Sequence, residues 1–301
     1  MVGGVQSTAA LVLAAQGKID YQTFLFCNVG TDSENPETLA YVEQVAKPYA
    51  ARHGLDLIEL SRKKRDGTVE TIYGRITRPD SRSIGIPVYM SSGAPGNRQC
   101  TYDFKVAVVD RWLKEQTESG YVQHMKEALL LRYGLKRLDK ETVLSVMGSL
   151  DQHFADREPV VVGLGISLDE IQRVKPNMDE KTIAWKVNAF PLLFDLPRPL
   201  SRQDCMSIIA GAGLPVPPKS SCWFCPFHTT RAWQELREQQ PALFWRAVAL
   251  EWLINERRQV LGKDRVWLSS KLKPLEQITT EYLQPSLFEG EAPCDSGYCF
   301  V

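Results

Sequence analysis

In the first sixty residues, segments with the apolar spacing of a helix alternate with segments that have the pattern of a strand. Residues 7–15 form a helical run that Gly17 closes, and residues 21–26 form a short apolar run with the aromatic enrichment of a strand. Apolar positions then recur at helical spacing over residues 36–53, and residues 55–60 alternate as a second strand. This β-α-β rhythm predicts an α/β fold with a parallel sheet, and it places ligands at the carboxyl ends of the strands.

The rest of the chain continues the alternation around one long basic segment. The pattern predicts, in chain order, a functional loop over 61–98, helices over 104–157 with an inserted helical part at about 117–157, a buried strand over 160–166, a strand or strand end over 191–196, and a helix that opens at Ser201 with Asp204 in its first turn. We therefore divide the chain into a nucleotide-binding domain over 1–233 and a helical C-terminal region over 234–301, which ends in a loose tail.

Composition narrows the class of protein. The 301 residues carry 36 basic and 36 acidic side chains, and seven cysteines. No apolar run reaches the roughly 18 residues of a membrane-spanning helix, and no signal peptide is visible, so we expect a cytoplasmic protein with no membrane partner. In a reducing cytosol the cysteines point to metal, cluster or redox chemistry. A net charge of zero argues against wholesale binding of nucleic acid, although residues 62–65 form a local basic patch.

The first residues have the make-up of a phosphate-binding loop. Glycines let a backbone approach an anion, and the amides of a helix start point at it. The alternative is a helix that a serine caps after a flexible start. The candidate residues are Gly3, Gly4, Gln6, Ser7 and Thr8.

The sharpest local motif is Cys222-Trp-Phe-Cys225. Two thiolates at this spacing can bind one metal ion or two corners of an iron–sulfur cluster, and they can also form a redox pair. Zinc would need two more ligands. We expect His228 to be structural and Cys27 to be buried. Three tryptophans in the helical C-terminal part are expected in the core, namely Trp233, Trp245 and Trp252.

The order of motifs resembles one superfamily. The loop at 3–8 is followed by a strand end with Asn28, Gly30 and Pro-Glu-Thr at 36–38, then by Arg98-Gln-Cys100 and Lys105, and by a Gly-containing turn at 163–173. This series resembles the PP-loop adenine-nucleotide α-hydrolases, and Gln6 is similar to their phosphoadenylyl-sulfate (PAPS) reductase branch. The resemblance implies a Rossmann-like, mostly parallel sheet with helices on both faces. The family's first strand precedes the loop, so the start is expected to be truncated or the strand missing, and restored upstream residues should raise the melting temperature.

The resemblance also implies a set of site residues. A 4Fe-4S cluster, or zinc, would be held by Cys100, Cys222 and Cys225, with Cys205, a tail cysteine or no protein residue in the fourth position. Arg98 and Lys105 could instead be solvated charges, and Cys205 could be a core thiol. Mg²⁺ is a candidate companion of the nucleotide. The implied nucleotide-binding residues are Gly3, Gly4, Gln6, Ser7, Thr8, Asn28, Gly30, Arg98, Lys105, Gly163 and Arg173.

The resemblance implies a reaction at an adenine nucleotide's α-phosphate or sulfate group, and Cys294 and Cys299 on the tail are candidate catalytic thiols. A thiol electron donor or a sulfur donor would then be a partner. One alternative is an ATP pyrophosphatase that sulfurates nucleic acid, with residues 62–65 as a contact surface. Another is a nucleotide-binding metal or redox sensor without catalysis. The tail cysteines could equally be an oxidisable pair or a metal clip. We expect a homo-oligomer.

Overall fold

The computed structural model describes residues 3–79, 81–82, 84–116, 159–174 and 186–281. These residues form a mixed α/β protein whose strands pair in parallel. Their strands make two separate two-stranded sheets, β1 with β2 and β3 with β4. No helix among these residues has the length and apolar character that a membrane crossing requires.

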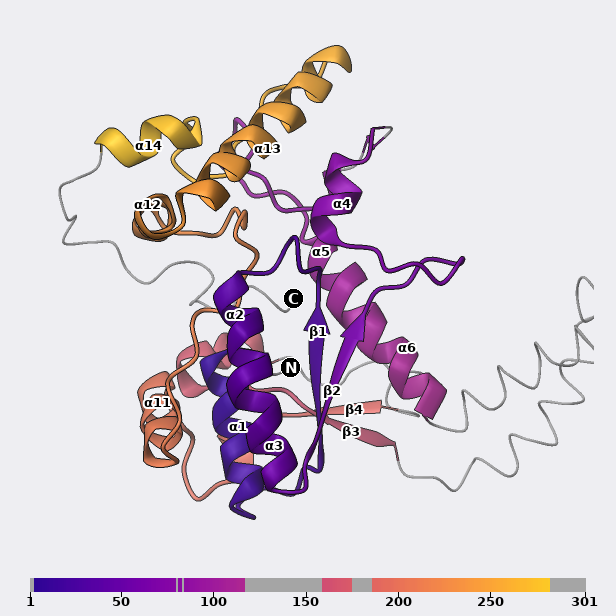
Figure 1. The fold of residues 1–301 in the computed structure, drawn as a ribbon, viewed down its shortest axis with the longest axis vertical. Coiled ribbons are helices and arrows are strands. Elements are labelled where there is room, and N and C mark those ends of the chain that lie inside the picture. Colours follow the sequence, from indigo (N-terminus) through magenta and orange to yellow (C-terminus); the bar gives the residue numbers. More distant parts are fainter. Residues whose placement is uncertain (1–2, 80, 83, 117–158, 175–185, 282–301) are drawn as a thin grey trace, which may run out of the picture.

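The first half follows the predicted β-α-β rhythm. Helix α1 (Val5–Ala15) precedes strand β1 (Thr23–Asn28), and β1 pairs in parallel with β2 (Asp56–Ser61). The helical stretch between the strands comprises α2 (Pro36–Tyr41), the π-helical turn η1 (Val42–Ala46) and α3 (Lys47–Arg52). Its start is fixed by Asn35, whose side chain accepts a hydrogen bond from the amide of Glu37. Figure 1 shows α1, α2 and α3 on one side of the β1–β2 pair and α6 (Ala107–Gln116) on the other.

The long segment after β2 is not the plain loop that its composition predicts. It contains helix α4 (Ile72–Thr77), which begins at Thr71, where the hydroxyl accepts a hydrogen bond from the amide of Gly74. The buried side chains Ile72 and Ile76 anchor this helix in the core. Helix α5 (Gln99–Thr101) and the π-helical turn η2 (Tyr102–Val106) then lead into α6. The predicted helical insertion over 117–157 lies outside the described residues.

The second parallel pair joins β3 (Val160–Gly163) to β4 (Lys186–Ala189). The predicted strand over 191–196 is wrong, because this segment forms the short helix α10 (Pro191–Phe194). Proline at the first position of a helix loses no hydrogen bond, and its fixed φ suits a helix start, which explains the difference. The 3₁₀-helix η3 (Leu168–Arg173) follows β3, and α11 (Arg202–Gly211) follows α10. Helix α11 opens as predicted, with a capping box between Ser201 and Asp204.

The C-terminal helices are α12 (Thr230–Gln239), α13 (Pro241–Val260) and α14 (Leu275–Glu281). Trp233 is fully buried, as predicted. The expectation for the other two tryptophans is wrong, because Trp245 is 50% exposed and Trp252 is 60% exposed. Helix α13 buries the face that carries Phe244 and Val248, and Trp245 lies about 100° round the helix from Phe244.

Candidate functional site

The start of α1 forms a compact loop that a side chain would obstruct. Gly3 has a φ of +127°, and a Cβ atom there would lie 3.1 Å from Phe26 Cε2 and 3.4 Å from Ser220 Oγ. Ser7 Oγ accepts from the amide of Gly4 at 3.3 Å and donates to the Gly4 carbonyl oxygen at 3.1 Å. The amides of the first helical turn have no carbonyl partner within the helix, so they remain donors for an anion.

The glycine turn after β3 packs against this loop. A Cβ atom at Gly165 would lie 3.3 Å from the backbone nitrogen of Ser7, and Gln6 Nε2 donates to Ser167 Oγ at 3.4 Å. The structure therefore brings together the two glycine motifs that the sequence analysis singled out. Gly163 has a structural reason of its own, since a Cβ atom there would lie 2.6 Å from Tyr21 Cε1.

Asn28 and Gly30 shape the end of β1. Asn28 Oδ1 accepts from the Gly30 amide at 2.9 Å, and Asn28 Nδ2 donates to Glu59 Oε1 at 2.8 Å. Gly30 has a φ of +127°, and a Cβ atom there would lie 2.5 Å from Thr71 Cβ. Both predicted nucleotide-binding residues are thus used to build the turn that follows the strand.

The Cys-x-x-Cys motif folds directly onto this turn. Glu34 and Cys222 form an antiparallel bridge, and the Trp223 amide donates to the Ser33 carbonyl oxygen at 3.2 Å. The Cys225 amide donates to the Cys222 carbonyl oxygen at 3.0 Å, which makes the motif itself a tight turn. Residues far apart in the sequence therefore place two cysteines beside the carboxyl end of β1.

Three cysteines gather in this region, and we call Cys100, Cys222 and Cys225 the thiol trio. Burial raises the pKa of the Cys100 thiol to about 11, and the Cys225 thiol adds to this shift. Burial also raises the pKa of Cys222 well above its ordinary value, and Glu34 and Cys225 add to it. The charge of Lys105 opposes both shifts. All three cysteines are free of disulfides.

Glu34 is a buried residue of this region that the sequence analysis did not single out. Its side chain is 1% exposed, and Oε1 has no hydrogen-bond partner although it is buried. Burial raises the pKa of this carboxyl, against the charge of Lys105 and a hydrogen bond from Ser220. Glu34 lies two residues before the Pro-Glu-Thr segment, and no periodicity marks a turn residue as buried, so the sequence held no signal for it.

Of the three predicted cationic groups, two lie near the thiol trio. The charge of Lys105 acts on the Cys222 thiol, and the guanidinium carbon of Arg98 lies 4.2 Å above the ring of Phe227, five residues after Cys222. Arg173 is placed differently, because its Nη1 pairs with Glu170 Oε2 at 2.7 Å and its side chain is 7% exposed. A buried ion pair of this kind already neutralises the charge that was predicted to clamp an anion.

The remaining cysteines are not part of the thiol trio. Cys205 is fully buried in the core cluster between α1 and α11, whereas Cys100 and Cys222 pack against the cluster of α12 to α14. Burial, followed by Asp204 and Asp169, raises the pKa of Cys205 to about 12. Cys27 is buried, as predicted. Cys294 and Cys299 lie outside the described residues.

The basic segment after β2 is divided between structural and exposed charges. Arg62 Nε pairs with Glu70 Oε2 at 2.7 Å, and Arg75 Nη2 pairs with the same oxygen at 2.5 Å. Arg75 Nη1 also pairs with Asp103 Oδ2 at 2.5 Å, which fastens the segment to the turn that carries Lys105. The exposed charges include Lys63, Lys64 and Arg65, with Asp66 beside them.

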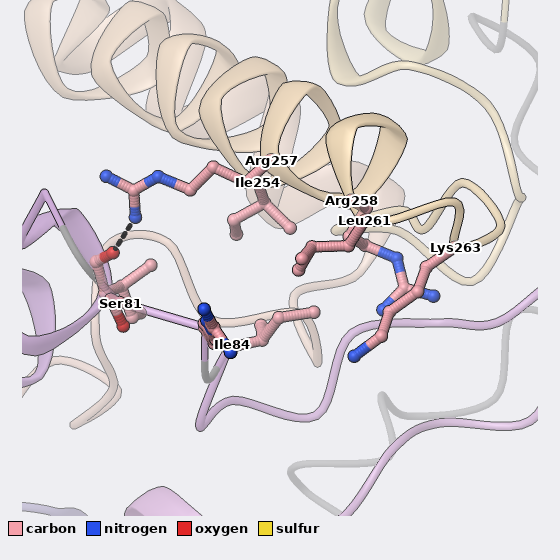
Figure 2. Close-up of a pocket in the computed structure, with 9 residues that line it drawn as sticks. Ser81, Ile84, Ile254, Arg257, Arg258, Leu261 and Lys263 are labelled. Carbon is pink, nitrogen blue, oxygen red and sulfur yellow. Dashed lines mark hydrogen bonds between the residues drawn. The ribbon is translucent and has the colours of Figure 1, made fainter.

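Figure 2 shows a second basic feature, a shallow pocket between α4 and α13. Arg82, Arg257, Arg258 and Lys263 line it together with apolar side chains. Arg257 donates to the carbonyl oxygens of Ile76 and Thr77 at 2.6 and 3.1 Å, so it holds α13 to α4. None of the lining residues belongs to the phosphate loop or to the thiol trio.

Among the described residues, no three His, Cys, Asp or Glu side chains are arranged so that they could hold a metal ion. Comparison with protein-family models, with curated proteins and with solved structures gives no match to the chain.

Proposed function

We propose that the chain is a PAPS-reductase-like PP-loop enzyme that binds an adenine nucleotide and acts at its α-phosphate or adenylyl-sulfate group. The observation that carries this proposal is the position of Ser220. Its hydroxyl lies 3.4 Å from the place that a Cβ atom would take at Gly3, and it bonds to Glu34, which forms a bridge with Cys222. Ser220 and Glu34 therefore link the loop that would bind a nucleotide phosphate to Cys222 of the thiol trio.

The arrangement of strands and helices supports a Rossmann-like fold. Both strand pairs are parallel, and α3 and α6 contact the β1–β2 pair from its two sides (Figure 1). In a doubly wound sheet, ligands bind outside the carboxyl ends of the strands. The turn after β1 meets the Cys-x-x-Cys motif, and the turn after β3 meets the start of α1.

The chain offers two kinds of group for an anionic nucleotide. Backbone amides at the start of α1, with Gly3, Gly4 and Ser7, would bind the phosphates. Lys105 and Arg98 would supply positive charge near the reacting group, where it stabilises the negative charge that develops as a bond to phosphorus or sulfur breaks. Thr8 and Gln6 stand in the same helical turn, and Mg²⁺ stays a candidate companion of the phosphates.

The thiol trio offers the ligand type of a 4Fe-4S cluster, and zinc is the alternative. Support for either comes from the chemistry of the side chains alone, because the described side chains do not converge as the ligands of one metal ion do. When bound, the cluster would supply electron-transfer or sulfur chemistry beside the nucleotide.

Two reactions fit this arrangement. In a reductase, a thiolate attacks the sulfur of the adenylyl sulfate and the nucleotide leaves. In a pyrophosphatase, an acceptor oxygen attacks the α-phosphorus of ATP, pyrophosphate leaves, and sulfur later displaces AMP. The second reaction has one supporting observation: Lys63, Lys64 and Arg65 are exposed on a turn that a Lys63–Val69 bridge closes, which offers a surface for nucleic-acid phosphates.

The test is turnover by the anaerobically purified protein. The protein is incubated separately with ATP, adenylyl sulfate and PAPS, and pyrophosphate and sulfite are measured. Pyrophosphate from ATP supports the sulfur-transfer enzyme, sulfite from either sulfate ester supports the reductase, and binding without any product supports the sensor. Lys105→Ala should lower the turnover at least tenfold, while Lys114→Ala, at a lysine of the following helix α6, should leave it unchanged.

A further inference from the structure

The shallow pocket between α4 and α13 gathers positive charge from three segments of the chain (Figure 2). Arg257 and Arg258 lie in the last turn of α13, Lys263 follows the end of that helix, and Arg82 follows α4. Cations in the last turn of a helix also stabilise the helix dipole, but this reason does not apply to Arg82, which comes from another segment. We call these four side chains and the cavity that they line the basic pocket.

The end of α13 turns Lys263 back toward Arg258. Gly262 has a φ of +63°, a left-handed conformation that glycine adopts easily, and the Lys263 amide donates to the Arg258 carbonyl oxygen at 2.8 Å. The Arg258 side chain is fixed as well, because its Nε donates to the carbonyl oxygen of Asp264 at 2.5 Å. The end of the helix therefore holds a guanidinium group and an ammonium group at the same cavity.

No negative side chain balances these charges in the part of the chain that the structure describes. There, no acidic side chain lines the basic pocket, and none of its four cations forms an ion pair. Arg257 donates to two carbonyl oxygens at the end of α4, so its role is to join the two helices. Arg82, Arg258 and Lys263 remain as three positive groups around one cavity. Like charges repel one another, and an anion bound between them would replace this repulsion with attraction.

A phosphate group is the anion that these side chains fit best. A planar guanidinium group donates two parallel hydrogen bonds to a carboxylate or a phosphate, and an ammonium group binds phosphate as a point charge. A carboxylate carries one negative charge, whereas a phosphate ester carries up to about two and offers three acceptor oxygens. Three cationic groups around one cavity therefore match a phosphate more closely than a carboxylate.

We propose that the basic pocket binds a phosphate group, at a site separate from the phosphate loop at the start of α1. The inference goes beyond the proposed function and does not depend on it, because the two sites share no residue. Arg82, Arg258 and Lys263 would contact the phosphate, while Arg257 holds together the helices that form the walls. Two sources supply such a group, namely the backbone of a nucleic acid and a free phosphate or phosphate ester.

The first experiment follows the reactivity of Lys263 in the wild-type chain. A succinimidyl acetate reagent acetylates exposed amines, and mass spectrometry of the digested protein reports the extent at each lysine. Lys18 is also exposed but does not line the pocket, which makes it the internal control. We expect inorganic phosphate, a short oligonucleotide or both to slow the acetylation of Lys263 several-fold and to leave Lys18 unchanged. Acetylation of Lys263 that neither ligand slows would overturn the proposal.

The second experiment removes charge from the pocket. Arg82→Gln combined with Lys263→Gln should leave the fold intact, because both side chains are exposed, and thermal unfolding checks this. Lys18→Gln combined with Arg52→Gln is the matched control, which removes the same charge from exposed positions outside the pocket. We expect the first pair to weaken binding of the protecting ligand about tenfold and the control pair to leave it nearly unchanged. An equal loss in both pairs would mean that only the net charge matters, which would overturn the proposal.

The dependence on salt separates the two sources of phosphate. Each contact with a nucleic-acid backbone adds about 0.7–0.9 to the slope of log affinity against log salt concentration, so the Arg82→Gln, Lys263→Gln pair should lower this slope by about 1–2 for an oligonucleotide. Protection of Lys263 by inorganic phosphate as strong as that by the oligonucleotide supports a free phosphate or phosphate ester instead. An oligonucleotide whose slope is unchanged by this pair, together with no protection by inorganic phosphate, would overturn the proposal.

Discussion

The indole nitrogen Nε1 of Trp223 donates a hydrogen bond to the carbonyl oxygen of Asp32 at 2.9 Å, across a separation of 191 residues. Trp223 is 1% exposed, so the donor side of this bond is buried. It fastens the segment of the Cys-x-x-Cys motif to the turn after β1. The candidate site therefore depends on the folding of both halves of the chain.

Removal of this bond should destabilise the protein measurably. Trp223→Phe keeps an aromatic ring but leaves the Asp32 carbonyl without its buried donor, and we expect a loss of about 1–3 kcal/mol in the free energy of unfolding, plus a contribution from the smaller ring. Urea unfolding measures it. Trp252→Phe, at an exposed position, should change the free energy by less than about 0.5 kcal/mol. Equal effects of the two changes would contradict the structure.

The turn at Gly30 should tolerate no side chain. Gly30→Ala would place a Cβ atom 2.5 Å from Thr71 Cβ at a φ of +127°. Gly17→Ala is the matched control, because Gly17 has a φ of +66° with nothing within 4 Å, so it isolates the backbone cost of about 1–2 kcal/mol. We expect Gly30→Ala to cost about 1–3 kcal/mol more than the control, as overpacking does. Thermal unfolding checks this order, and the reverse order would contradict it.

The elements that the sequence predicts well are those with a strong local pattern. Helix α1, both strands of the first pair and the capped start of α11 follow their apolar period or their cap residues. Helix α4 and the exposed tryptophans were missed for a different reason. Whether α4 forms, and whether a tryptophan is buried, depends on contacts with a distant part of the chain. Helix α4, for example, is held by Arg257 from a helix about 180 residues further on.

The candidate region also contains both residues that the sequence marks by a motif and residues that it does not mark. The phosphate loop and the Cys-x-x-Cys motif are visible as short motifs, and the structure places them near each other through Ser220. Glu34 was invisible because its importance comes from burial beside Cys222, a partner 188 positions later in the chain. Arg173 stays a predicted nucleotide-binding residue, and nothing in the sequence indicated its ion pair with Glu170.

Helix α13 offers a direct optical test of which tryptophans are exposed. Trp245 and Trp252 are half exposed or more, whereas Trp223 and Trp233 are buried. Acrylamide quenches the fluorescence of exposed indoles more strongly than that of buried ones. Trp245→Phe with Trp252→Phe should lower the quenchable fraction clearly, and Trp233→Phe should raise it. A quenchable fraction that is unchanged by the first pair of substitutions would show that this face is covered in solution.

The ion pairs around Glu70 should make stability depend on pH. Hydrogen bonds from Arg75, followed by those from Arg62, lower the pKa of this carboxyl from 4.5 to about 2. As the pH falls, the unfolded chain therefore takes up the proton first, so the stabilisation is complete above about pH 4.5 and is lost progressively toward pH 2. The difference in unfolding free energy between the wild type and Glu70→Gln should be constant above pH 5 and shrink toward pH 3. Glu235→Gln, which removes a pair with the exposed Arg231, should show almost no such change, because solvent screens that pair. A difference for Glu70→Gln that does not vary with pH would mean that Arg62 and Arg75 do not hold this carboxylate in solution.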